Sequence, residues 1–152
     1  MEIVKIPSLI LKKQLNNVPL KDIGSGKHAP LTDNMRQTMT EAKGIGLAAN
    51  QVGQDLMLFV IDKKLAKENA VPDVFFNPEV TNYSRDKDEM EEGCVSIPGF
   101  YHHIRRSKKI KIKAVDEHGR KVKFKAKGLL ARVLQHETDH LNGYTVKDRV
   151  SD

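Results

Sequence analysis

The sequence predicts an α+β domain in which mostly antiparallel sheets pack around one central helix, with a second helix nearer the N-terminus. Two segments with helical apolar spacing flank a middle region that is rich in strand patterns. Strands and helices do not alternate regularly, which argues against a parallel α/β sheet. A single domain is expected over residues 1–152, because a chain of 152 residues can bury roughly 70% of its unfolded surface around one core.

The first helical pattern runs from Pro30 to Lys43. Proline suits the first turn of a helix, and Gly44 suits a stop directly after it. The apolar or small positions recur every three or four residues, at Leu31, Met35, Met39 and Ala42. The pattern predicts an amphipathic helix that leads into a glycine-containing segment.

Strand patterns occupy the middle of the chain. Apolar runs at residues 56–61 and 74–76 predict buried strands, the second of which stops before Asn77-Pro78. Lysines then alternate with apolar residues over 109–114 and again over 121–127. This period of two predicts a β-hairpin with an apolar inner face and a lysine-coated outer face. The outer face is either a solvated surface that resists edge pairing or a patch that contacts the ribosome or another RNA.

The last helical pattern covers residues 129–141, and Gly143 is expected to end the helix. It contains the sequence HETDH, an HExxH motif that begins at His136. Residues four apart lie on one face of a helix, so His136 and His140 can bind one metal ion while Glu137 reaches a metal-bound water. This helix is expected to be largely enclosed, since burial keeps imidazole ligands oriented.

An open catalytic metal site needs a third protein ligand. Val146 stands where a third histidine would complete HExxHxxGxxH, and no glutamate follows Glu137. Cys94, the one cysteine of the chain, is therefore the expected third ligand, and its alternative is a small buried apolar residue. A thiolate with two imidazoles suits zinc or ferrous iron. The other histidines are weaker ligand candidates: His28, His102, His103 and His118.

Three segments resemble the motif boxes of the peptide deformylase family, in that family's order. They are GIGLAANQ at 44–51, EGCVS at 92–96 and QHETDHLNG at 135–143. The resemblance implies sheets packed around the motif-bearing helix, in a compact form that lacks a long C-terminal extension. It implies a metal-dependent hydrolase that removes the N-formyl group from the initiator methionine of newly made polypeptides and releases formate. The cofactor would be one divalent ion, Fe²⁺ in cells, with Zn²⁺ or Ni²⁺ as alternatives.

Glu137 is the expected general base, which takes a proton from water and passes it to the departing amine. The resemblance implies that the Gln51 side-chain amide and the Val95 backbone N–H stabilise the developing oxyanion. It also suggests that Glu92 and Arg106 orient the metal ligands, although from sequence they could equally form a surface ion pair or make no mutual contact. The residues that match the family's pocket for a methionine side chain, or that could be core packing instead, are Ile45, Gly46, Met90, Leu129 and Val133.

Three positions depart from the family's familiar pattern. Asn50 stands where proline or threonine is more common, and Tyr101 stands where an arginine often helps to bind the substrate backbone. Arg132 replaces an apolar residue near the expected pocket, which leaves the subsite preference open.

Composition favours a cytoplasmic protein. One cysteine excludes an internal disulfide, and the first residues lack the apolar run of a signal peptide or membrane helix. The formal net charge of +6 favours contact with polyanions, and a monomer is the expected state.

Two rival functions stay open from sequence. One is an HExxH metallopeptidase that cleaves ordinary peptide bonds, although its usual third ligands are missing. The other is a non-enzymatic ribosome- or RNA-binding protein with a structural metal. Glu137 discriminates between catalysis and a structural site, because only hydrolysis requires it.

Overall fold

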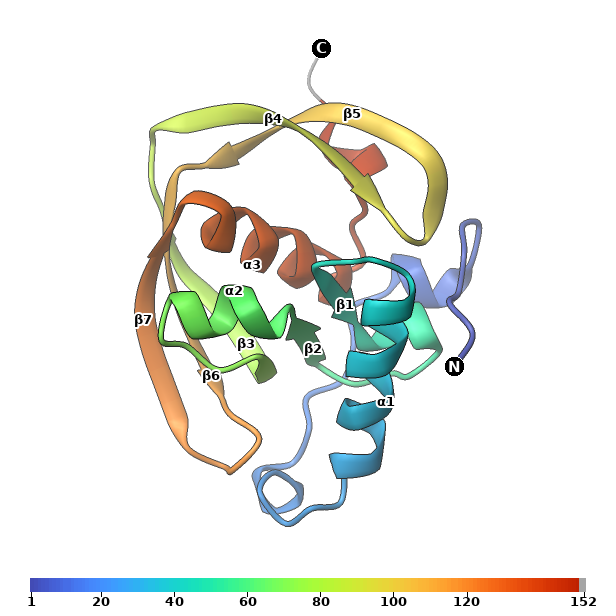
Figure 1. Cartoon of the computed structure of the whole chain (residues 1–152), viewed down its shortest axis with the longest axis vertical. Helices are drawn as coiled ribbons and strands as arrows, with labels where there is room; N and C mark the ends of the chain where they lie inside the picture. Colours follow the sequence, from blue (N-terminus) through green and yellow to red (C-terminus); the bar gives the residue numbers. More distant parts are fainter. Residues whose placement is uncertain (151–152) are drawn as a thin grey trace.

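The computed structural model describes residues 1–150 and confirms the expected α+β class (Figure 1). A five-stranded antiparallel sheet has the order β1-β2-β3-β6-β7, and β4 and β5 form a separate hairpin. The strands are β1 (Gly46–Ala48), β2 (Leu58–Ile61), β3 (Val74–Tyr83), β4 (Lys87–Cys94), β5 (Ile97–Ser107), β6 (Lys109–Val115) and β7 (Lys121–Lys127). The helices are α1 (Ala29–Glu41), α2 (Lys63–Glu68) and α3 (Gly128–Leu141), with 3₁₀ turns at Leu9–Lys12, Leu20–Asp22, Ala49–Val52 and Val146–Arg149.

Helix α3 crosses the middle of the molecule, against the five-stranded sheet and under the arch of the β4–β5 hairpin (Figure 1). Its apolar side packs into one core cluster with the sheet, through buried residues such as Leu130 and Leu134. Met35 and Met39 of α1 belong to a second core cluster, in which they pack with sheet residues such as Leu58 and Val60. Burying a leucine contributes on the order of 2 kcal/mol, so this packing fixes the position of α3.

Helix α1 ends earlier than the sequence predicted. Glu41 is its last residue, and Lys43 rather than Gly44 adopts the left-handed conformation, with φ of 57°. The Gly44 N–H donates to the Met39 carbonyl at 2.9 Å and the Lys43 N–H to the Thr40 carbonyl at 3.0 Å. This is the hydrogen-bond pattern of a Schellman motif, centred one residue before the glycine that was expected to stop the helix.

Strand β3 also differs from its prediction, because it continues through Asn77-Pro78 to Tyr83 instead of stopping at Phe76. Asn77 has a φ of 49°, and the pairing with β6 shifts register between Phe76 and Glu79. The Asn77 side chain accepts from the Val18 N–H at 2.8 Å and donates to the Val18 carbonyl at 2.9 Å. A β-bulge therefore accommodates the asparagine-proline pair inside the strand.

The lysine-rich hairpin has the predicted form. Along β6, exposed lysines alternate with buried Ile110 and Ile112, and β7 places Ala126 inward. Within the described residues, no helix is long and apolar enough to span a membrane.

Candidate metal centre and active site

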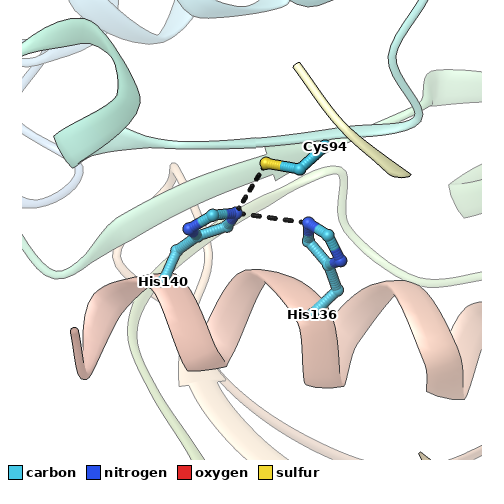
Figure 2. Close-up of side chains that lie close together, drawn as sticks. All are labelled: Cys94, His136 and His140. Carbon is cyan, nitrogen blue, oxygen red and sulfur yellow. Dashed lines mark hydrogen bonds between the residues drawn. The ribbon is translucent and has the colours of Figure 1, made fainter. Parts of the chain in front are cut away.

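Three potential metal ligands meet between the β4–β5 hairpin and α3. Figure 2 shows Cys94, from the end of β4, facing His136 and His140, which lie one turn apart on α3. The Cys94 Sγ lies 3.4 Å from the His140 Nε2, which lies 3.2 Å from the His136 Nε2. All three donor atoms lie within 4.8 Å of one another. The structure thus brings together the three ligands expected from sequence.

The two imidazoles present Nε2 to this common point for different reasons. The His136 Nδ1 lies 2.9 Å from the Glu92 Oε1, which leaves Nε2 directed toward the other two donors. His140 is fully buried, and its Nδ1 has no hydrogen-bond partner among residues 1–150. Burial lowers the pKa of His140 well below its usual value, which favours the neutral imidazole that a metal binds.

The donor chemistry and the geometry fit a divalent metal ion. One sulfur and two imidazole nitrogens converge, which is a set that binds zinc or ferrous iron. Cys94 is only partly buried and its sulfur lies 3.4 Å from the His140 Nε2, so its surroundings favour the ligand prediction over the alternative of a small buried apolar residue. His28, His102, His103 and His118 lie outside this group of donors in the described structure.

Glu137 is buried beside the donors. Its Oε2 lies 3.9 Å from the His136 Nε2, and its Oε1 has no hydrogen-bond partner within residues 1–150. Burial raises the pKa of Glu137 to about 7, which is suitable for a general base near neutral pH. Gly46 passes directly over this carboxylate, and a Cβ at that position would overlap it.

The Gln51 amide has a fixed orientation next to the thiol. Its Oε1 accepts from the Ala48 N–H at 2.9 Å, so its Nε2 is directed to the Ser96 Oγ at 3.0 Å and the Cys94 Sγ at 3.4 Å. The backbone of Val95 follows Cys94 in the turn between β4 and β5 and lines the same cavity. Ser96, to which the sequence assigned no role, is fully buried and holds the amide in place.

A buried ion network lies behind His136. Arg106 donates to both carboxylate oxygens of Glu92, each at 3.0 Å, and to the Asp139 Oδ2 at 2.6 Å. Burial alone would raise the pKa of Glu92, but the hydrogen bonds from His136 and Arg106 lower that pKa to about 2. Arg132 also contacts this carboxylate, at 2.5 Å. The structure thus joins Glu92 and Arg106 in a buried ion pair next to His136, and their role in orienting the metal ligands stays a prediction.

A cavity of about 790 Å³ opens at the donors. The five residues expected to bind the substrate side chain all line it: Ile45, Gly46, Met90, Leu129 and Val133. Three of them, Ile45, Met90 and Leu129, are 48% exposed, so they form a wall of the cavity rather than the protein core. Val133 is buried and belongs to the core as well.

The three departures from the family pattern have different surroundings. The Asn50 Nδ2 donates to the His140 carbonyl at 2.7 Å, which ties the ligand helix to the segment after β1. Tyr101 is an exposed residue at the cavity, paired with Gly93 across the β4–β5 hairpin. Arg132 also lines the cavity, but its guanidinium is buried in the ion network.

A family model described as "Polypeptide deformylase" matches residues 1–152. The chain belongs to the polypeptide deformylase family. This confirms the family expected from the motif boxes.

Known deformylases are similar to this chain over almost its whole length. A peptide deformylase of Prochlorococcus marinus strain MIT 9312 is 45% identical over 99% of the chain and 74% of that relative. A peptide deformylase of Thermodesulfovibrio yellowstonii is 42% identical over 99% of the chain and 89% of that relative. Family membership also makes the activity a metal-dependent one, consistent with the Cys94-His136-His140 group.

Solved deformylase structures share the fold. The crystal structure of the Thermotoga maritima enzyme matches with a TM-score of 0.89 and 34% identity, over 99% of this chain and 97% of that one. A Synechococcus elongatus peptide deformylase in complex with actinonin matches with a TM-score of 0.91 and 38% identity, over 100% and 81%.

Proposed function

We infer that the protein removes the N-formyl group from the initiator methionine of newly made polypeptides. The products are formate and a polypeptide with a free amino terminus. The observation that carries this inference is the family match over the whole chain. The site supports it, because a buried glutamate lies next to three convergent metal donors at an open cavity. The same match argues against the rival metallopeptidase and against a purely structural metal.

We propose that Cys94, His136 and His140 hold one divalent metal ion, Fe²⁺ in cells, with Zn²⁺ and Ni²⁺ as functional substitutes. When bound, such an ion polarises a carbonyl group and makes water more acidic. The mixed sulfur and nitrogen donor set supports these ions over magnesium or calcium, which prefer oxygen ligands.

Glu137 carries the proton in the proposed reaction. Its carboxylate accepts a proton from water as the water oxygen bonds to the formyl carbon. It then gives that proton to the amine nitrogen as the carbon–nitrogen bond breaks. The burial of Glu137 and the unpartnered Oε1 within the described residues support this role, since a structural glutamate would be expected to have partners.

The Gln51 Nε2 and the Val95 N–H are the proposed donors to the formyl oxygen, on which negative charge develops. The bond from Ala48 supports this role for Gln51, because it fixes the amide before substrate binds. The methionine side chain would lie against Ile45, Met90 and Leu129. A formyl group is smaller than the carbonyl of an internal peptide bond, so a confined site can select it by shape.

The deciding experiment compares hydrolysis of formyl-Met-Ala-Ser with that of its acetylated counterpart. The protein is purified anaerobically with Fe²⁺, and separately with Zn²⁺ or Ni²⁺. Formate release from the formyl peptide alone is the expected result, and the ranking of the ions tests the metal proposal. Folded, metal-loaded protein that cuts neither peptide would contradict the proposed function.

We also propose that the outer face of the β6–β7 hairpin contacts ribosomal RNA. Lysines stand directly opposite one another on the two strands, which is unfavourable in an isolated hairpin. These residues, called the lysine face, are Lys109, Lys111, Lys113, Lys123, Lys125 and Lys127. Among described residues an ion pair is found at only one of them, Lys113 with Glu79 at 3.4 Å. The alternative is a solvated face that protects the edge strand β7.

Co-sedimentation with ribosomes distinguishes these two readings. Changing Lys111, Lys123 and Lys125 to glutamine should weaken binding and make it less dependent on salt, because each lost phosphate contact reduces the salt slope. The matched control changes the exposed lysines Lys63, Lys64 and Lys67 of α2 to glutamine. Equal co-sedimentation of the two triple variants would leave only the protective role.

We propose a cytoplasmic monomer. The proposed substrates emerge from ribosomes in that compartment, and the net charge of +6 favours mutual repulsion of copies. Light scattering of the metal-loaded protein should give the mass of one chain, 17.1 kDa.

A further inference from the structure

The carboxylate of Glu92 orients His136, and three side chains hold that carboxylate. Its Oε1 lies 2.9 Å from the His136 Nδ1 and accepts from the Arg106 Nη2 at 3.0 Å. Its Oε2 accepts from the Arg106 Nε at 3.0 Å and from the Arg132 Nη1 at 2.5 Å. Each oxygen therefore has two partners, and the carboxylate is held from both edges.

Arg132 is anchored independently of Glu92. Its Nη1 also donates to the Ile104 carbonyl at 3.0 Å, and its Nη2 donates to the Asp88 carbonyl at 3.0 Å and the Asp88 Oδ1 at 2.7 Å. Arg132 lies four residues before His136, so both side chains leave the same face of α3. One guanidinium thus joins the ligand helix to both strands of the β4–β5 hairpin.

Charges of opposite sign alternate through this network. Arg132 lies between Asp88 and Glu92, and Arg106 lies between Glu92 and Asp139. Arg132 also pairs with Asp88, and Arg106 also pairs with Asp139. The two arginines therefore do not compete for the carboxylate of Glu92. Without Arg132, the Glu92 Oε2 would keep one partner and the carboxylate could tilt toward Arg106, away from the His136 Nδ1.

We propose that Arg132 is a positioning residue of the metal centre, which keeps Glu92 in place and thereby holds His136 in the orientation that retains the metal ion. The proposal rests on the ligand set proposed above. It gives Arg132 a role that the sequence did not suggest, since the sequence associated this residue only with the substrate pocket. Loss of a group that hydrogen-bonds directly to a metal ligand typically costs about 10- to 100-fold in metal affinity, so the effect of losing Glu92 sets the upper limit for the effect of losing Arg132.

The test measures how fast the metal-loaded protein loses Co²⁺ or Zn²⁺ to an excess of a chromophoric chelator. Arg132→Gln should release the ion several-fold faster than the unchanged protein, up to the limit of about 10- to 100-fold set by loss of Glu92 itself. Arg132→Lys should also release it faster, because one ammonium group cannot donate to Glu92, Ile104 and Asp88 with the geometry of a guanidinium. The lysine variant keeps the charge and the aliphatic stem, so it guards against a glutamine variant that fails to fold.

Arg36 provides a matched control. It donates to both oxygens of Asp73 at 2.9 Å, to Asp33 at 3.0 Å and to Glu117 at 2.5 Å, and this network shares no residue with the one behind His136. Arg36→Gln removes a comparable arginine network, so it should lower stability without changing the rate of metal release. Faster release from Arg36→Gln equal to that from Arg132→Gln would overturn the proposal, since general destabilisation would then explain both.

A double variant tests whether Arg132 acts through Glu92. Glu92→Gln should itself release the metal faster, and adding Arg132→Gln should cause little further change. Effects that multiply would overturn the proposal, as would wild-type release rates from both Arg132 variants. If the unchanged protein binds no metal ion, the ligand set fails instead, so the two failures are distinguishable.

Discussion

The backbone of Gly46 lies against the carboxylate of Glu137, so closely that a methyl group on Gly46 would overlap the Glu137 Oε2. The two residues come from different elements, β1 and α3. The Glu137 carboxylate can therefore lie beside the metal donors only if residue 46 has no side chain.

Gly46→Ala should displace Glu137 and lower kcat/KM by about 100-fold or more, which is the contribution of a well-placed general base. The matched control is Gly44→Ala, because a Cβ there would make only ordinary contacts, the nearest 3.5 Å from the Gly46 carbonyl oxygen. Steady-state kinetics with a formyl peptide checks both variants at equal metal content. Comparable activity of the two alanine variants would contradict the prediction.

Glu137→Gln should lower kcat by about 10² to 10⁴-fold while the bound metal is retained, because the amide cannot accept the proton but fills the same space. Metal analysis of the purified variant accompanies the kinetics. Full activity in this variant would remove Glu137 from the reaction.

The loss of activity at low pH should follow the protonation of Glu137. The carboxylate acts as a base only when it is deprotonated, and burial raises its pKa to about 7. The value of kcat/KM should therefore fall as pH decreases below about 7, well above the range of an ordinary glutamate near 4.3. Metal content is measured at each pH, so that loss of the ion is not mistaken for protonation. A rate that stays constant from pH 8 to pH 5 is the contrary outcome.

Asn77 should matter for stability rather than for chemistry. Asn77→Ala removes two hydrogen bonds to Val18 and places alanine at a φ of 49°, so the free energy of unfolding should fall by about 2 kcal/mol or more. Asn77→Gly removes the same bonds but tolerates this φ, so its loss should be smaller. Urea denaturation measures both, and a glycine variant less stable than the alanine variant would contradict this account.

The elements with a clear period could be predicted from the sequence. The lysine alternation identified β6 and β7, and the helical spacing identified α3 together with its end at Gly143. The β4–β5 hairpin was missed because Lys87–Cys94 is mostly exposed and shows no period of two in its burial. The end of β3 was wrong because asparagine and proline usually stop a strand, and only tertiary bonds to Val18 explain the bulge.

The candidate site was predictable where chemistry follows from spacing. The HExxH pattern gave His136, Glu137 and His140, and the missing third ligand led to Cys94. The residue roles stay predictions that the experiments above address. The partners of Arg132 could not be predicted, because Asp88 and Ile104 approach it only when the hairpin folds over α3.

The proposed ligands lie on two parts of the chain, since Cys94 belongs to the β4–β5 hairpin and both histidines belong to α3. A two-stranded hairpin is marginally stable alone, and a small apolar cluster, with Ile97, Ile104 and Val146, joins the ion network of Arg106 and Arg132 in holding β4 and β5. Binding and folding are therefore linked by mass action: an ion that binds only the folded chain adds about 2.7 kcal/mol when its free concentration is 100 times its Kd. The melting temperature of this protein should accordingly report the free metal concentration around it.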